Sequence, residues 1–459
     1  MFSSIANTFS NCFKIPELKS RILFTLLILL ICRLIALVPV PGLDAAALRI
    51  FLDENRSSAD GLLGMYSLFT GGALENCAVG SLGIMPYISA TIIIQLLTAV
   101  IPTLAKLARE EGGRAKIVQY GRYLTLLLCL GQGFVMALGW EHPEKMFNGF
   151  AGKLVVTDYL WWYRINTVVI LTTGTLLLMW LGEQITERGI GNGVSLVITI
   201  GILARLPQAA TSLYLNFFPP TGDEGNRLNL FHAIALILLL GAVVAAVVAV
   251  TQGQRKVPVQ HAQRAVGRKV YAGGSSFMPL RVNYAGVMPI IFAQAILMFP
   301  GKIFTTLGQV MDVKFFTELG RMLEHTSVLY LLLFSAMILF FSYFWVATQF
   351  NEIQIADDLK KSGGYIPGVR PGQETSKFLH RTMSRITLAG AIFLTVIAVI
   401  PDLMNRGMGL DPAVSTFFGG TSMLITVGVL LDTMRQMETH LLMRHYDGFL
   451  KKGRIRGRF

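Results

Sequence analysis

The chain has 459 residues, of which 53% are hydrophobic and only 15% are charged, and its mean hydropathy is +0.56. A soluble domain usually has about a quarter of its residues charged, so this composition excludes a soluble protein and indicates a lipid-facing surface. The formal net charge of +13 does not indicate nucleic-acid binding, because the basic residues lie mainly in connections between apolar runs and in the C-terminal tail.

Ten apolar runs follow one another along the chain. A hydrocarbon core about 30 Å thick takes roughly 20 apolar residues of helix, and the first run lacks a small-residue cleavage site, so we interpret it as a retained span. The sequence predicts an all-α polytopic membrane protein with ten transmembrane helices. The predicted spans are Ile22–Val40, Leu82–Ile101, Tyr123–Trp140, Ile165–Leu181, Val194–Leu206, Leu230–Val250, Val282–Phe299, Val328–Ala347, Ile386–Ile400 and Phe417–Leu431.

The distribution of basic residues predicts the orientation. The N-terminal segment, the even-numbered connections and the tail carry 28 Lys and Arg, and the odd-numbered connections carry 11. The positive-inside rule therefore places both termini in the cytoplasm. The predicted organisation is a cytoplasmic segment 1–21, a first half 22–206, a periplasmic connection 207–229, a second half 230–434 with cytoplasmic loops 252–280 and 348–385, and a basic cytoplasmic tail 435–459.

The two large cytoplasmic loops are longer than topology requires. Arg255, Lys256 and Arg264 lie in the first of them, which contains no carboxylate. Contact with anionic lipid is one interpretation of such charges. The length of the loops favours the other, which is docking of a cytoplasmic partner.

Two pairs of short strings recur in the chain. Gly83–Ala90 matches Gly286–Ala293 at five of eight positions, and Gly193–Thr199 matches Gly420–Thr426 at four of seven. The matches pair span 2 with span 7 and span 5 with span 10, as a duplication of five spans would. Because five is odd, the two halves must cross the membrane in opposite directions, and such repeats place functional sites at their interface.

The repeat also aligns single residues. Ile88 corresponds to Ile291, and Ile198 corresponds to Ile425. Each alone would be an ordinary core isoleucine, but four at equivalent positions favour a shared central feature.

A further apolar segment, Leu62–Ala73, precedes the second span. It is too short to cross the membrane and ends with the pair Gly71 and Gly72. Non-spanning backbone at membrane depth must be buried in protein or line a cavity. We therefore predict a short re-entrant helix hinged at these glycines.

Seven strings spread along the chain resemble the bacterial SecY family from end to end. They are Pro39–Gly42, Phe69–Leu74, Gly83–Ala90, Gly182–Gly193, Asp358–Gly363, Ile366–Gly372 and Phe418–Ser422. The resemblance implies a channel that passes unfolded preproteins across the cytoplasmic membrane and releases apolar helices sideways into it, with no enzymatic activity and no cofactor. It also implies two inverted five-helix halves around a central pore.

The resemblance implies roles for particular residues. The pore ring would consist of Ile84, Ile88, Val194, Ile198, Ile291 and Ile425. The plug, residues 62–72, would include Leu62, Met65, Phe69, Gly71 and Gly72. The lateral gate between spans 2/3 and 7/8 would include Ser89, Gln132 and Asn283, and the docking face would include Arg255, Lys256, Arg264 and Arg370.

The resemblance also implies partners and a location. The partners would be the small membrane subunits SecE and SecG, the SecA motor, the ribosome, a preprotein with its signal sequence, membrane lipid and, as further candidates, SecDF and YidC. The location would be the bacterial inner membrane.

Two other classes compete with this interpretation. A secondary transporter also has inverted repeats, but it usually buries ionisable residues at the midplane, and Arg33 is the only clear intramembrane charge, for which helix packing or assembly is favoured. An intramembrane enzyme is disfavoured because Ser195 and Ser422 have no histidine near them in the pattern.

Overall fold

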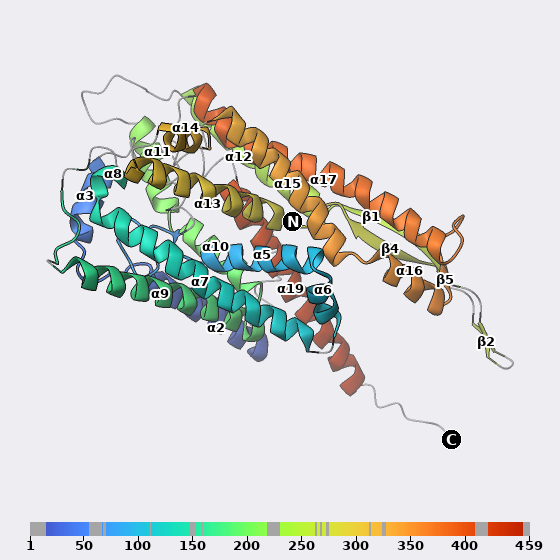
Figure 1. Cartoon of the computed structure of the whole chain (residues 1–459). Helices are drawn as coiled ribbons and strands as arrows, with labels where there is room; N and C mark the ends of the chain where they lie inside the picture. Colours follow the sequence, from blue (N-terminus) through green and yellow to red (C-terminus); the bar gives the residue numbers. More distant parts are fainter. Residues whose placement is uncertain are drawn as a thin grey trace.

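The structure is a computed structural model, an elongated helical bundle with a small sheet at one end (Figure 1). It describes residues 15–54, 67, 70–110, 112–146, 150, 152–157, 159–217, 230–261, 264–266, 269–271, 275–311, 314–323, 327–408 and 421–452. The first half contains α2 (Pro16–Ile35), α3 (Ala45–Glu54), α5 (Met85–Val100), α6 (Pro102–Arg109), α7 (Gly113–Glu141), α8 (Pro143–Met146), α9 (Leu160–Arg188), α10 (Gly193–Leu203) and α11 (Leu206–Phe217). The second half contains α12 (Leu230–Gln252), β1 (Gln254–His261), β2 (Arg264–Val266), β3 (Lys269–Tyr271), β4 (Ser275–Arg281), α13 (Met288–Met311), α14 (Lys314–Met322), α15 (Val328–Gln349), α16 (Glu352–Lys361), β5 (Gly364–Tyr365), α17 (Gln373–Met408) and α19 (Thr421–Lys452).

Each of the ten predicted spans overlaps a helix in the described residues, namely α2, α5, α7, α9, α10, α12, α13, α15, α17 and α19. Within the described residues, six helical stretches are long and apolar enough to cross a membrane, or seven if α5 and α6 are counted as one bent span. That bend measures 105° and lies where Pro102 begins α6. The predicted helical polytopic class is therefore confirmed.

The two halves repeat the same neighbour relationships. In the first half α5 packs on α7, α7 on α9, α9 on α10 and α10 on α2. In the second half α13 packs on α15, α15 on α17, α17 on α19 and α19 on α12. The halves meet where α5 contacts α13 and where α10 contacts α19, so the helices that carry the repeated strings form the interface.

The repeated strings also share a backbone conformation. Gly83 and Gly286 both have positive φ, 60° and 64°. Each is followed closely by a Met-Pro pair that opens α5 or α13, where proline is well tolerated because its missing N–H would be unpaired anyway. The repeat is therefore present in the structure as well as in the amino-acid sequence.

Several boundaries differ from the prediction. Helix α10 ends at Leu203 and α11 begins at Leu206, inside and at the end of the predicted fifth span. Helix α17 extends beyond the predicted ninth span at both ends. Hydropathy marks only the apolar part of a helix, so it underestimates helices that continue into polar surroundings.

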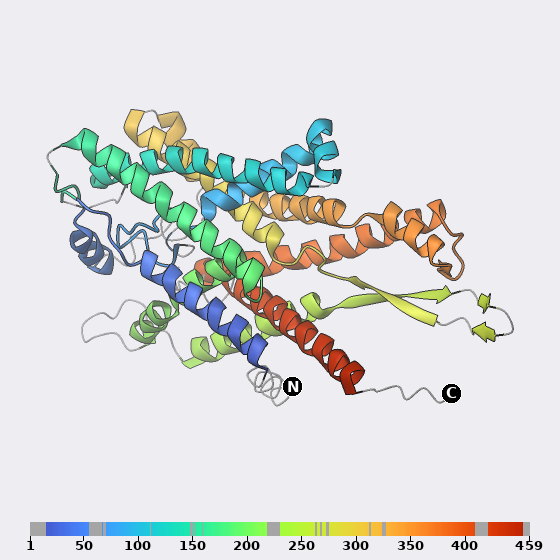
Figure 2. The same ribbon diagram turned by 90° about the horizontal axis from the view of Figure 1, so that it is seen from below.

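A three-stranded sheet with strand order β4-β1-β5 adds to the helical bundle. It projects from one end, here called the sheet end, while α3, α8, α11 and α14 lie at the opposite end (Figures 1 and 2). In β1 the buried Val257 and Val259 alternate with exposed residues, the pattern of a half-buried strand. The pairing of Gln260 with Tyr365 joins the two long loops in one sheet.

Candidate functional site

Five of the six residues of the predicted pore ring belong to the main apolar core of the described structure, and the sixth, Val194, packs against it. They are contributed by α10, α13, α19 and the start of α5, from both halves. Ile425 is completely buried, Ile198 and Ile291 are 1% and 2% exposed, and Val194 packs against the cluster from its edge. We call this set (Ile84, Ile88, Val194, Ile198, Ile291 and Ile425) the waist.

One polar contact lies beside the waist. It joins α13 and α19, about one helical turn from Ile291 and from Ile425. Gln294 of α13 donates through Nε2 to the Thr421 hydroxyl of α19 at 2.9 Å, and both side chains are buried. The oxygen of the same amide, Gln294 Oε1, has no hydrogen-bond partner among the described residues. Nothing in the sequence marks Gln294 as functional, because a lone glutamine in an apolar run has no distinctive spacing.

Gly71, one of the two predicted hinge glycines, lies directly against the waist helix α10. At Gly71, whose φ is +64°, an added Cβ would stand 2.8 Å from the Cα of Gly201 and would collide with the Arg33 guanidinium. Gly201 is one turn from Ile198 on α10. We call Ser67, Gly71 and Gly72 the plug base. Through Gly71, the plug base contacts the helix that supplies part of the waist. The other predicted plug residues, Leu62, Met65 and Phe69, lie outside the described residues.

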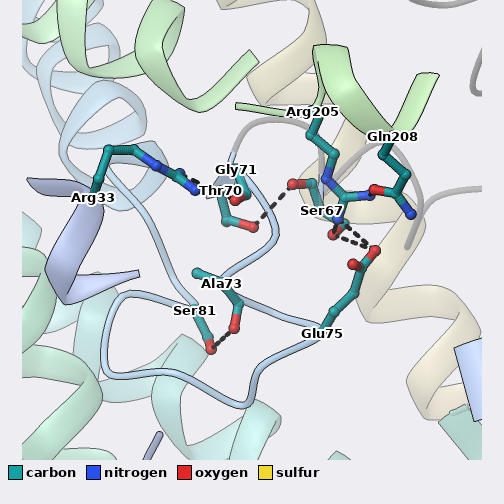
Figure 3. Close-up of polar contacts among 9 residues, drawn as sticks. All are labelled: Arg33, Ser67, Thr70, Gly71, Ala73, Glu75, Ser81, Arg205 and Gln208. Atoms are coloured by element: carbon teal, nitrogen blue, oxygen red, sulfur yellow. Dashed lines mark hydrogen bonds and ion pairs between the residues drawn. The ribbon is translucent and has the colours of Figure 1, made fainter. Parts of the chain in front are cut away.

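Side chains from two other elements hold this plug base (Figure 3). Arg33 of α2 donates through Nη1 to the Gly71 carbonyl at 3.1 Å. Arg205, between α10 and α11, forms an ion pair with Glu75 and donates to the Ser67 hydroxyl. Arg205 was counted in the sequence only for topology, and nothing in one sequence connects it with a carboxylate 130 residues away.

A backbone seam fixes the chain just after the hinge. Val40 N–H donates to the Cys77 carbonyl at 2.9 Å, and Val79 N–H donates to the Val38 carbonyl at 2.9 Å. Cys77 is completely buried, and its burial raises the pKa of the thiol to about 12, with Asp44 adding a smaller effect in the same direction. The Cys77 thiol therefore stays protonated. The backbone hydrogen bonds of the seam hold the chain after Gly72 against the end of α2.

The predicted gate residues do not form a polar cluster among the described residues. Ser89 of α5 and Gln132 of α7 are partly buried. Asn283 lies in the turn before α13, where its amide donates to the Gly286 carbonyl at 3.0 Å. No hydrogen bond within the described part of the chain links the three residues, so their role in a gate stays a prediction.

Helices α7 and α9, in contrast, are clamped at both ends by arginine–carboxylate pairs. Arg122 contacts both oxygens of Glu183, at 3.2 and 2.7 Å. Near the other end, Arg164 contacts both oxygens of Glu141 at 2.9 Å. Such two-point pairs fix geometry as well as charge, so α7 and α9 form one rigid unit.

Three of the predicted docking residues, Arg255, Lys256 and Arg370, are exposed at the sheet end. Arg255 and Lys256 lie on β1, and Arg370 lies in a turn between Gly368 and Gly372, whose φ angles are 80° and 100°. The Thr375 hydroxyl donates to the Arg370 carbonyl at 2.9 Å, which fixes the backbone behind the exposed side chain. Arg264 begins β2.

The fold and the site together define a helical polytopic membrane protein with an apolar core shared by its two halves. A SecY family model matches residues 78–434. The chain is 41% identical to the protein translocase subunit SecY of Chlamydia trachomatis, covering 98% of this chain and 99% of that one. It is 42% identical to the same subunit of Escherichia coli K12, with 96% of each chain covered. The chain belongs to the SecY family, whose members are channel subunits and not enzymes.

Solved structures share the fold at low sequence identity. A protein-conducting channel superposes with a TM-score of 0.59 at 18% identity, with 92% of both chains covered. A SecY structure concerned with how the plug domain stabilises the closed channel and maintains a membrane seal gives 0.57 at 17% identity and 92% coverage of both chains. Sec61 in a canine ribosome–channel complex gives 0.55 at 16% identity, again with 92% of both chains covered.

Proposed function

We propose that the waist is the constriction through which this protein-conducting channel passes unfolded preproteins. The observation that carries the proposal is that these six branched aliphatic residues lie in or against the apolar core shared by the two halves, on helices that meet where α5 contacts α13 and α10 contacts α19. An apolar constriction loses its water when it is empty. Its side chains also offer a passing chain no hydrogen bond, so different sequences can move through without being held.

The segment 62–72 acts as a plug on the outer side of the waist. The contact of Gly71 with Gly201 supports this, because it seats the plug base one turn from the waist residue Ile198. Deleting residues 62–72 should leave a folded channel with a higher resting ion conductance in planar bilayers. An unchanged conductance in a folded deletion variant would contradict the plug role.

The lateral gate opens between α5/α7 and α13/α15. The contact of α5 with α13, where the two halves meet, supports a gate at this boundary. Hydrogen bonds between membrane helices contribute only about 0.6 kcal/mol on average. A gate held by few polar contacts is therefore suited to opening by an apolar signal helix.

The sheet end faces the cytoplasm, and the chain lies in the bacterial inner membrane with both termini inside. The excess of Lys and Arg in the connections on this side supports the placement of this side in the cytoplasm, because cytoplasmic loops are enriched in basic residues. The halves 22–206 and 230–434 are then inverted repeats, and 207–229 is periplasmic. SecE, SecG, SecA, the ribosome, preproteins and lipid are the partners, with SecDF and YidC as further ones.

Arg370 docks the cytoplasmic partner, ribosome or SecA. Its guanidinium stays charged and presents a planar fork of donors that lysine lacks. Arg370→Glu should abolish export of a precursor and Arg370→Lys should weaken it, at unchanged membrane levels of the channel. Full export by the glutamate variant at a normal channel level would refute this role.

A further inference from the structure

The hinge of the plug has two kinds of connection to the bundle. On one side, the backbone seam ties residues 77–80 to residues 35–40, including a bond from Gly80 N–H to the Ile35 carbonyl. On the other side, the described hydrogen bonds that join Ser67 and Gly71 to α2 and to the α10–α11 connection come from the side chains of Arg33 and Arg205. A plug that leaves its seat can keep the seam, but it must break the arginine contacts.

Arg205 lies across the hinge. Its guanidinium pairs with Glu75, which follows Gly72, and donates to Ser67, which precedes Gly71. The space over Gly72 is filled by the same group, since an added Cβ there would lie 3.6 Å from Arg205 Nη2. One side chain thus connects the movable side of the hinge with the fixed side.

Two acceptors orient Arg205 for this contact. Glu75 pairs with Nη2, and the Gln208 side chain accepts from Nη1 at 3.0 Å. The Ser67 hydroxyl also donates to Glu75 at 3.0 Å, so serine, glutamate and arginine form a closed triangle. The side chains of Arg205 and Glu75 are only 15% and 25% exposed, and a pair so shielded from water is stronger than a surface pair.

We propose that Arg205, oriented by Glu75 and Gln208, is a latch that holds the plug closed, with Arg33 as a second contact on the Gly71 carbonyl. This inference rests on the proposed plug role of residues 62–72. It assigns a polar release step to channel opening, in which Ser67 leaves Arg205 and Glu75 and Gly71 leaves Arg33, while the backbone seam remains.

The test measures the resting open probability of purified channels in planar bilayers. Arg205→Met keeps the length of the side chain and removes its charge, and Glu75→Gln removes the group that orients it. We expect about a tenfold rise for Arg205→Met, the factor that corresponds to about 1.4 kcal/mol, and a smaller rise for Glu75→Gln. Arg164→Met, which breaks the matched pair with Glu141 away from the plug, should leave the open probability unchanged.

A charge exchange gives a readout that general damage would not produce. The double variant Arg205→Glu/Glu75→Arg restores an ion pair, and the Ser67 hydroxyl can either donate or accept, so the open probability should return toward that of the parent. In a channel lacking residues 62–72, Arg205→Met should add no further leak, because the two changes act on the same contact.

The outcomes separate the latch from the plug. If the deletion raises the leak but Arg205→Met and Glu75→Gln do not, the latch is wrong and the plug stands. If the deletion itself has no effect, the plug role fails. If Arg205→Met still raises the leak in the deletion background, Arg205 acts elsewhere and the latch is overturned. Should Arg205→Met not fold, Glu75→Gln and the charge exchange decide the question.

Discussion

The waist and the plug base are neighbours built on opposite physical principles. The waist consists of branched aliphatic side chains from four helices, and dispersion contacts of this kind have no preferred direction. The plug base consists of glycines and of directional contacts from two arginines. The first arrangement can adapt to any chain that passes, whereas the second is either made or broken.

This difference indicates that the waist and the plug base have separate roles. A hydrophobic ring resists ions because it is dry, and it can re-form around a moving polypeptide. A glycine hinge held by arginines fits only one partner surface, because Gly71 meets the backbone of Gly201 directly. In the proposed channel, the waist therefore determines what can pass, and the plug base determines when the channel is closed.

The largest effect is expected from placing a polar group in the waist. Ile291→Asn should raise the resting ion conductance more than tenfold, since an amide retains water where isoleucine excludes it. Single-channel recording of the purified protein measures this. Ile237→Asn on the exposed face of α12 is the control, since Ile237 is 70% exposed and lies outside the waist. Equal changes in conductance in the two variants would contradict the claim that the waist, and not the lipid-facing surface, controls ion leakage.

A smaller effect is expected from Gly71→Ala. The new Cβ would meet Gly201 and the Arg33 guanidinium at a φ of +64°, so the plug base should move away from α10 and the resting conductance should rise several-fold. Gly286→Ala is a matched control because its φ is also +64° but no atom lies within 4 Å of the added Cβ. Both variants carry the same backbone cost of about 1–2 kcal/mol.

The glycine pair tests whether close contact matters apart from backbone strain. Thermal unfolding in detergent should show the shared loss of stability in both variants, and leak should appear only in Gly71→Ala. A leak of the same size in Gly286→Ala would show that backbone strain alone accounts for the effect.

A stability change without a leak is expected from Arg164→Gln. This variant leaves the partly buried Glu141 without its two-point partner, and we expect a loss of about 1–3 kcal/mol in the free energy of unfolding, the usual cost of an unpaired buried polar group. Conductance should not change, because the pair does not touch the plug base or the waist. Denaturant unfolding and bilayer recording on the same preparation check both statements.

The smallest effect is expected at the other end of the same helix pair. Arg122 is about half exposed, with 47% of its side chain accessible, and exposed ion pairs contribute about 0–1 kcal/mol. Arg122→Gln should therefore destabilise the protein less than Arg164→Gln does. The reverse order would mean that exposure does not set the strength of these two clamps.

The apolar part of the structure could be predicted from the sequence, and much of the polar part could not. Hydropathy located the ten helices, and the internal repeat aligned Ile88 with Ile291 and Ile198 with Ile425, which the structure brings into one cluster. These patterns are local or repeated, so a single sequence contains them.

The plug base and the sheet depend on pairs far apart in the chain. Arg205 and Glu75 are separated by 130 residues, and neither position differs from an ordinary loop charge until the fold brings them together. The alternation around Val257 and Val259 is a local signal for a strand, but two alternating positions in a basic loop are too few to predict a sheet whose other strands come from distant residues. Asn283 pairs within its own turn, which the spacing of polar residues does not indicate.

The most direct test of the waist is disulfide formation with a precursor arrested during transport. Single cysteines at positions 88, 198, 291 and 425, in a channel whose four native cysteines are replaced, should each cross-link to a cysteine in the arrested chain. A cysteine in place of the fully buried Phe334 of α15 should not. Cross-links at the Phe334 position as strong as those at the four waist positions, or none at the waist, would contradict the account.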